Sequence, residues 1–375
     1  MVTIEVVDTH DKAQVNRFIR FYYNLYRDCP QWVPPILSDV HLMLNPQKHP
    51  YFEHAAAEYY LAVKDGQDAG RMVVHENLAF NECHGTREAD FYLFDTIDDQ
   101  EVANALFERA FDWAKKRGLD RMVGPKGFSP FDGYGIQIEG TDLRQMMTMM
   151  NYNYDYYPKL VENLGFTKEV DFVSCYLARE NFNLPDRVKE IAQKVQDRGA
   201  FRVINFQSKR ALIAMAKQIG EAYNNTFVKN WEYYPLTERE IKFVVDTLIN
   251  TADPRLIKII THEDKVVGFL LGFPDVSKAL QRAKGHLNPI TLVDLLREMK
   301  RTDWVSLNGA GMLPEYHGRG GNALLYSEMQ KTIETYNFKH AELTQVAETA
   351  VQMRQDLINV GGKAYKNHRV YQRKI

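Results

Sequence analysis

The chain has 375 residues, which is enough for two domains. Its 45% hydrophobic and 26% charged residues are typical of a soluble globular protein with a sizeable core. The formal net charge of −2 excludes the strong basic excess of a dedicated nucleic-acid binder, so we expect no nucleic-acid partner.

The sequence shows no signal of export, membrane insertion or metal binding. Its first residues contain no basic segment followed by an apolar one, and no apolar run reaches the ~18 residues of a transmembrane helix. Cys29, Cys83 and Cys175 lie far apart without a Cys-x-x-Cys pair, and the histidines form no ligand cluster. We therefore expect a cytoplasmic protein with no membrane partner, no disulfide framework and no metal.

The first half contains a predicted β-hairpin and, after it, a predicted helix. Ala57–Val63 and Ala69–Val74 alternate around the polar turn Lys64–Asp68, as the two strands of a hairpin do. The helix is expected over Glu101–Arg117, and the segment Phe91–Gln100 before it contains no glycine.

That segment supplies carboxylates at the helix start, namely Asp95, Asp98 and Asp99. Negative side chains stabilise the N-terminus of a helix but repel a phosphate group that would bind there. We therefore expect that the first half binds no nucleotide-like pyrophosphate.

Aromatic and glycine-rich segments follow in the first half. Gly124–Gly135 is rich in Gly and Pro and is either a functional lid or a surface loop. The tyrosines of the next segment favour a core or interface role by their alternation: Tyr152, Tyr154, Tyr156 and Tyr157. The alternative is that Tyr152 and Asn153, with Tyr233 from the second half, line a cleft for an aromatic or extended substrate.

The second half repeats the pattern of the first. Arg255–Ile260 and Val266–Leu271 form another predicted hairpin, and in both halves a helix that ends at a glycine precedes a strand. These features recur roughly 200 residues apart, which indicates a duplicated α+β unit. The boundary is expected near Asn181–Pro185, which gives one domain over residues 1–180 and another over 181–375.

A glycine-rich turn in the second half predicts an anion site. The apolar run Trp304–Leu307 leads through Asn308–Gly311 to Gly318, Gly320 and Gly321, and a helix pattern begins after them. A strand, a glycine-rich turn and a helix start together direct several backbone N–H groups and a positive helix end at one point. Such a point binds anions, most often phosphate.

This stretch resembles the acyl-CoA pyrophosphate loop of the GNAT acyltransferase superfamily. The pattern of that family is Pro-x-Tyr-Arg/Gln-Gly-x-Gly-Ile/Val-Gly/Ala-x-x-Leu, and here it extends from Pro314 to Leu325. His317, Gly321 and Asn322 depart from the usual residues. The order of elements in both halves is also that of a GNAT unit, and the whole chain resembles bacterial tandem GNAT-like proteins through segments such as Trp32–Pro35 and Gly124–Phe128.

The resemblance implies a fold, a cofactor and a set of binding residues. The fold is an α+β (α/β mixed-sheet) arrangement of two tandem GNAT-like acyl-CoA N-acyltransferase units, each a mixed β-sheet flanked by helices. The co-substrate is acetyl-CoA or another acyl-CoA. The residues expected to bind it are Met312, Leu313, Gly318, Arg319, Gly320, Gly321 and Asn322.

The resemblance leaves the catalytic acid and base open. Leu357 stands where the family usually has a tyrosine acid, and it has no proton to give. Tyr365 lies in the next segment and is the remaining candidate acid. The strand Trp304–Gly311 contains no Asp or Glu that could act as the base.

The implied activity is acyl-CoA-dependent N-acylation, with acetyl transfer to the amine of a small molecule or peptide. The missing tyrosine acid favours a different class, a non-catalytic acyl-CoA or metabolite-binding protein. A transferase that uses an aminoacyl-tRNA-type donor is a third possibility. The acceptor, the acyl length and the oligomeric state stay open.

Overall fold

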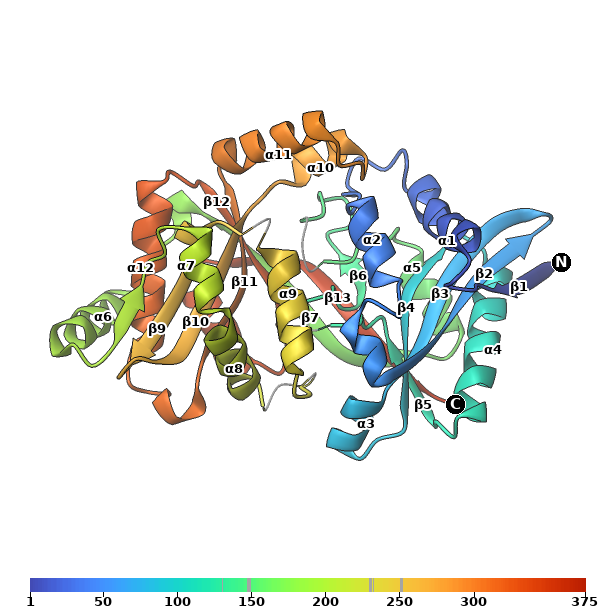
Figure 1. Cartoon of the computed structure of the whole chain (residues 1–375), viewed down its shortest axis with the longest axis horizontal. Helices are drawn as coiled ribbons and strands as arrows, with labels where there is room; N and C mark the ends of the chain where they lie inside the picture. Colours follow the sequence, from blue (N-terminus) through green and yellow to red (C-terminus); the bar gives the residue numbers. More distant parts are fainter. Residues whose placement is uncertain (130, 147–149, 229–230, 232, 250–251) are drawn as a thin grey trace. The chain divides into compact units, whose positions relative to one another are not determined.

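The computed structural model describes residues 1–129, 131–146, 150–228, 231, 233–249 and 252–375 (Figure 1). The described chain divides into two compact units. The first consists of Met1–Val173, Ser277–Leu295 and Lys366–Ile375, and the second of Ser174–Val276 and Leu296–Tyr365. The units are thus interleaved along the chain. The repeat boundaries predicted at 1–180 and 181–375 stay a prediction, because spatial units and duplicated segments need not coincide.

The first unit contains a mixed sheet with the strand order β1-β2-β3-β4-β5-β13, and β6 also pairs with β13. The pair β4–β5 is parallel, and the pairs β1–β2, β2–β3, β3–β4, β5–β13 and β6–β13 are antiparallel. The elements are β1 (Val2–Val6), α1 (Lys12–Leu25), α2 (Leu37–Met43), β2 (Ala55–Lys64), β3 (Gln67–Asn77), α3 (Leu78–His84), β4 (Glu88–Thr96), α4 (Gln100–Lys116), β5 (Arg121–Gly124), β6 (Ile136–Glu139), α5 (Tyr157–Asn163), β7 (Thr167–Ala178), α10 (Ser277–Ala283) and β13 (Lys363–Lys374), with β7 and β13 continuing past the division.

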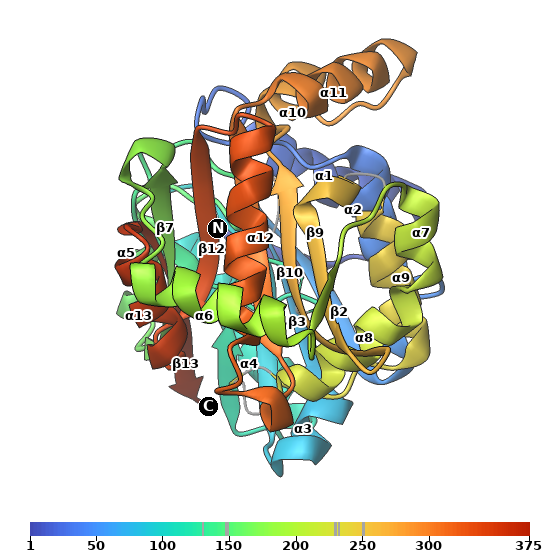
Figure 2. The same ribbon diagram turned by 90° about the vertical axis from the view of Figure 1, so that its left-hand side faces the viewer.

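The second unit contains strands in the order β12-β11-β10-β9-β8. Here β11 and β12 are parallel, and the other pairs are antiparallel. Figure 2 shows α12 against these strands with α6 crossing it. The elements are α6 (Asp186–Arg198), β8 (Arg202–Ile204), α7 (Lys209–Ala214), α8 (Ala216–Thr226), α9 (Glu238–Leu248), β9 (Ile257–His262), β10 (Lys265–Pro274), β11 (Trp304–Met312), α12 (Gly321–Thr335), β12 (His340–Ala347) and α13 (Val351–Asn359). The helix α11 (Pro289–Arg301) crosses the division, because its residues up to Leu295 belong to the first unit.

Both predicted hairpins are present, and each carries a β-bulge beside a glycine. The register of β2 and β3 shifts next to Gly70, and the register of β9 and β10 shifts next to Gly268. A Cβ at Gly268 would lie 2.7 Å from the carbonyl oxygen of Gly311 and 2.9 Å from Ile260. Only a glycine therefore allows β11 to approach here. The shared bulge supports the duplication inferred from the sequence.

The core of the first unit forms where α4 packs on its sheet. The helix starts after Asp99, whose side chain accepts hydrogen bonds from two amides of the first turn. Its apolar face buries Leu106 and Phe107 completely, and the Phe107 ring lies 5.0 Å from those of Phe91 and Phe166. This burial fixes the helix start next to β4. Among the described helices, none is long and apolar enough to cross a membrane.

Candidate functional site

The parallel strands β11 and β12 separate before they end. Their pairing runs from Trp304 opposite His340 to Leu307 opposite Leu343, whereas β11 continues beside β10 to Met312. A bulge in β11 falls at Gly309, whose φ is +138°. The splay predicted over Asn308–Leu313 is therefore present, and it opens one edge of β11.

The glycine-rich turn that follows leads directly into α12. The amides of Gly318, Gly320, Gly321, Asn322 and Ala323 donate no hydrogen bond within the described part of the chain. The first intrahelical bond runs from Leu324 to the carbonyl of Gly320. These open N–H groups gather at the positive end of a helix of 15 residues. The arrangement fits an anion such as a pyrophosphate.

Two side chains of the turn have assignable roles. His317 Nε2 lies 2.8 Å from the carbonyl oxygen of Met312, so this nitrogen carries the proton and donates across the turn. The Arg319 guanidinium lies over the ring of Tyr316, 5.2 Å from its centre, and the residue is exposed. His317 thus braces the turn where the GNAT pattern has Arg or Gln, while Arg319 offers the positive charge.

The three glycines of the turn serve different purposes. Gly318 has a φ of +73° and open space around it. A Cβ at Gly320 would lie 2.7 Å from Val195 and 2.8 Å from Ile191 of α6. A Cβ at Gly321 would lie 2.3 Å from the Met312 Cε. Gly320 and Gly321 therefore let α12 begin close to α6 and β11, whereas Gly318 and Asn322 are exposed.

Polar side chains lie where β11 and β12 begin to separate. Ser306, Asn308 and Thr344 are buried and hydrogen-bonded to one another, with 3.1 Å between the hydroxyls of Ser306 and Thr344. Glu342 pairs in register with Ser306, which places it on the same face of the sheet. Its carboxylate accepts a hydrogen bond from the phenol of Tyr365 on β13.

Glu342 is a candidate site residue that the sequence did not predict. It is 1% exposed and pairs with Tyr365, the predicted candidate acid, from a different strand. Leu357, in the family's usual acid position, is buried and apolar. A carboxylate and a phenol in contact beside the open edge of β11 can accept and supply protons.

The corresponding helix start in the first unit has a different chemistry. Asp99 caps α4 and also forms a 2.5 Å ion pair with Lys64. Asp95 is buried and paired with Arg71, whose guanidinium lies 4.3 Å from the ring centre of Tyr22. The helix start is thus satisfied by side chains of the unit itself, which fits the prediction that it binds no pyrophosphate.

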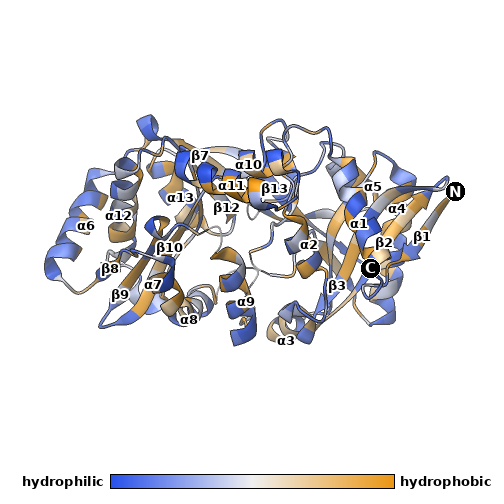
Figure 3. Cartoon of the chain, turned by 45° about the horizontal axis from the view of Figure 1, so that its top comes forward, coloured by the Kyte–Doolittle hydropathy of each residue, from blue (hydrophilic) through white to orange (hydrophobic). Residues whose placement is uncertain are grey.

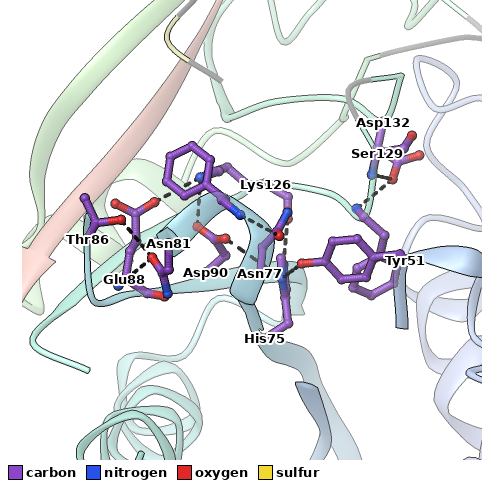
Figure 4. Close-up of polar contacts among 12 residues, drawn as sticks. Tyr51, His75, Asn77, Asn81, Thr86, Glu88, Asp90, Lys126, Ser129 and Asp132 are labelled. Atoms are coloured by element: carbon purple, nitrogen blue, oxygen red, sulfur yellow. Dashed lines mark hydrogen bonds and ion pairs between the residues drawn. The ribbon is translucent and has the colours of Figure 1, made fainter. Parts of the chain in front are cut away.

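A buried charge cluster in the first unit joins the first residues of β4 to the loop that follows β5 (Figure 4). Lys126 forms ion pairs of 2.9 Å with Glu88 and 3.1 Å with Asp90. Burial raises the pKa values of both carboxyl groups, although Lys126 opposes this. His75 donates from Nε2 to the carbonyl of Lys126 and accepts from Tyr51, and burial lowers its pKa to about 3. These groups satisfy one another and hold the Gly124–Gly135 loop.

The same loop is fixed at its other end by a buried carboxyl group. Asp132 accepts hydrogen bonds from the amides of Phe128 at 2.8 Å and Ser129 at 3.0 Å. Burial raises the pKa of Asp132 to about 6. The described part of the loop is therefore tied into the unit, which favours an anchoring role over the predicted lid.

The predicted substrate residues have partners inside their own unit. Tyr152 donates to the carbonyl of Thr141 at 3.1 Å and packs against Tyr26. Asn153 bonds both backbone groups of Gln137. Tyr233 belongs to the second unit and is partly buried. Core packing accounts for Tyr152 and Asn153, and the cleft stays a prediction. Within the described residues, no three His, Cys, Asp or Glu side chains gather as a metal site would require.

The fold is that of tandem GNAT proteins. A tandem GNAT protein from the clavulanic acid biosynthesis pathway superposes with a TM-score of 0.55 and 10% identity, covering 100% of this chain and 98% of the other. A GCN5-related N-acetyltransferase from Anabaena variabilis superposes with a TM-score of 0.52 and 6% identity. This match covers 100% of this chain and 72% of the other. At such identities the likeness concerns the fold.

Two relatives are similar in sequence over nearly their full lengths. Protein YghO of Escherichia coli is 27% identical over 97% of this chain and 94% of its own. Bacterial ceramide synthase of Caulobacter vibrioides is 27% identical over 99% of this chain and 98% of its own length. No protein-family model matches the chain.

The first prediction concerns the buried carboxyl group of the anchored loop. The pKa of Asp132 is about 6 in the folded state, whereas its ordinary value is 3.8. Between about pH 4 and pH 6 the carboxyl group is therefore protonated in the folded parent but ionised in the unfolded chain. The parent therefore loses stability as the pH rises through that window, by at most about 3 kcal/mol. Asp132→Asn keeps an oxygen acceptor and should lack this loss.

Urea unfolding between about pH 4 and pH 7 measures the difference between parent and variant. The advantage of Asp132→Asn should grow with pH and level off above about pH 6. The exposed Asp142→Asn serves as the control and should follow the parent. A difference that does not change with pH would show that Asp132 is ionised throughout.

Proposed function

We propose that the protein is an acyl-CoA-dependent N-acyltransferase whose acyl-CoA site lies in the second unit. The observation that carries this proposal is the group of open backbone amides from Gly318 to Ala323 at the start of α12. Their position beside the splayed strands supports a phosphate-bearing ligand with an extended arm. The open edge of β11 from Asn308 to Gly311 offers backbone partners for the amide groups of a pantetheine arm.

The chemistry of the proposed reaction assigns roles to Glu342 and Tyr365. The amine nitrogen attacks the thioester carbonyl carbon, the C–N bond forms and the C–S bond breaks. Glu342 takes the proton that the amine loses, directly or through water, and Tyr365 gives a proton to the departing thiolate. The hydrogen bond between the two residues allows the proton to pass back from the carboxyl group to the phenolate. This pair favours an enzyme over a non-catalytic binding protein.

The similarity to known proteins supports a proposal for the acyl donor and the acceptor. A ceramide is the amide of a fatty acid and a sphingoid base, so similarity to Bacterial ceramide synthase over 99% of this chain favours a fatty acyl-CoA and the amine of a long-chain amino alcohol. Acetyl transfer to a small amine is the alternative, in keeping with the Anabaena neighbour's description. Both reactions use the same pyrophosphate site and the same proton transfers.

The second prediction places the pyrophosphate at α12. Asn322→Glu adds a carboxylate to the exposed first turn, where it stabilises the helix but repels phosphate. CoA affinity should fall at least tenfold while the thermal midpoint stays within a few degrees of the parent. Calorimetric titration of CoA into parent and variant measures this effect.

Thr335→Glu is the matched control, because it adds the same charge at the exposed opposite end of α12. Its CoA affinity should equal that of the parent. This substitution is preferable to a change at Gly320, where a side chain would collide with Val195 and Ile191. A parent that binds no CoA, or equal binding by Asn322→Glu, contradicts the proposed site.

The third prediction tests the proton-transfer pair. Glu342→Gln keeps the size and the hydrogen-bond acceptor but removes the base, so kcat should fall about 10²- to 10⁴-fold. Tyr365→Phe should also lower kcat, and CoA affinity should change less than about threefold in both variants. Amide product formed from palmitoyl-CoA or acetyl-CoA with sphinganine and a panel of small amines is measured by mass spectrometry.

Glu334→Gln, at an exposed position of α12, is the control for the charge change. It should leave the turnover unchanged. Full activity of Glu342→Gln would remove this residue from the mechanism. If the parent binds CoA but forms no amide from any donor, the protein is the non-catalytic binder instead.

A further inference from the structure

The helix α11 and the turn before it expose an unusual amount of aliphatic surface. Ile290 is 81% exposed, and Leu292, Val293 and Leu296 are each between 43% and 49% exposed. Leu287, in the preceding turn, is 50% exposed. Only Leu295 of the helix is buried. Contiguous aliphatic exposure of this kind marks an interaction surface.

These residues lie on one side of the helix together with basic residues. At 3.6 residues per turn, Leu292, Leu296, Val293 and Ile290 fall within an arc of about 180°. The same arc contains Lys300, Arg297 and Arg301. Every residue of α11 is described, and its two carboxylates, Asp294 and Glu298, lie beyond one end of this arc. We call these four aliphatic and three basic residues the α11 face.

The local charge contrasts with that of the whole chain. Residues 277–301 contain six Lys or Arg and two Asp or Glu, whereas the chain has a net charge of −2. One of the two carboxylates, Asp294, is already paired with Arg282 at 2.8 Å. Figure 3 shows apolar and hydrophilic segments alternating along α11. The cations of the α11 face are thus left to act on a partner.

We infer that the α11 face docks the protein onto an anionic lipid surface. A helix with exposed aliphatic side chains among cations lies in the interface of a bilayer, with the apolar groups below the head groups and the cations beside the phosphates. The long stems of Lys and Arg reach from one layer to the other. This inference rests on α11 alone and does not depend on the proposed function.

Charge argues for this partner and against a second copy of the chain. In a symmetric dimer the same patch meets itself, so Arg297, Lys300 and Arg301 of the two copies would be brought together. Like charges at such an interface are unfavourable, and no carboxylate of the α11 face offsets them. An anionic bilayer satisfies both the aliphatic and the cationic groups.

Sedimentation of the intact protein with vesicles tests the inference. Binding is expected to phosphatidylcholine vesicles that contain phosphatidylglycerol, and much less to phosphatidylcholine alone. It should weaken between about 0.1 M and 1 M salt, as the Debye length falls from about 10 to 3 Å. Two double variants should each weaken binding at least tenfold. Ile290→Ser/Val293→Ser removes aliphatic groups that enter the bilayer. Arg297→Gln/Lys300→Gln removes two cations, each of which contributes about fivefold to binding.

Matched controls separate the α11 face from general exposure and charge. Val351→Ser/Ile358→Ser changes two exposed aliphatic residues of α13, and Lys115→Gln/Lys116→Gln changes two exposed cations of α4. Neither should alter vesicle binding. Absence of binding by the parent, or equal loss in a control, overturns the inference. So does a dimer that Ile290→Ser/Val293→Ser dissociates without any vesicle binding, since the face would then belong to a second copy.

Discussion

The close approach of α12 to β11 is the constraint on which the candidate site depends. Gly321 brings the first turn of the helix so near the strand that a Cβ would lie 2.3 Å from the Met312 side chain. Gly320 does the same toward α6, and the β-bulge at Gly309 turns β11 away from β12. Together they place open amides, an open strand edge and the hydrogen-bonded pair of Glu342 and Tyr365 in one unit. A side chain at either glycine would separate these parts.

The two units share an order of strands and helices but differ in the chemistry of their helix starts. In each, a hairpin with a bulge at a glycine leads to two parallel strands and a helix. Asp99 satisfies the helix start in the first unit, whereas the second unit leaves its amides open. In the first unit the Lys126 ion cluster also occupies the space between the first residues of β4 and the loop after β5. The helix start of the second unit thus keeps unbonded amides, whereas that of the first unit is capped by its own side chains.

Much of the fold could be predicted because its signals are local. Alternation of apolar and polar residues predicted both hairpins. The glycines after α5 and α13 predicted the helix ends, because Gly165 and Gly361 adopt the positive φ that ends a helix. The mixed α+β sheet and the tandem GNAT arrangement are confirmed. The splay at Asn308–Leu313 also followed from its glycines.

The parts that sequence reasoning missed depend on contacts between distant segments. Glu342 accepts a hydrogen bond from Tyr365 because β12 and β13 lie in the same sheet. No local sequence pattern predicts this contact. One signal was present: Ser306 and Asn308, then Glu342 and Thr344, place polar residues at every second position of buried strands. The roles of Gly320 and Lys126 likewise require knowledge of α6 and β4, which pack against them.

We propose that the second unit, and not the first, carries a phosphate-binding helix start. Hydrogen exchange of the intact protein with and without CoA, followed by mass spectrometry, distinguishes the two helices. The amides from Gly318 to Ala323 should exchange more slowly when CoA is present, and those at the start of α4, from Asp98 to Val102, should not change. Protection at α4 instead, or at neither helix, would show that the proposal is wrong.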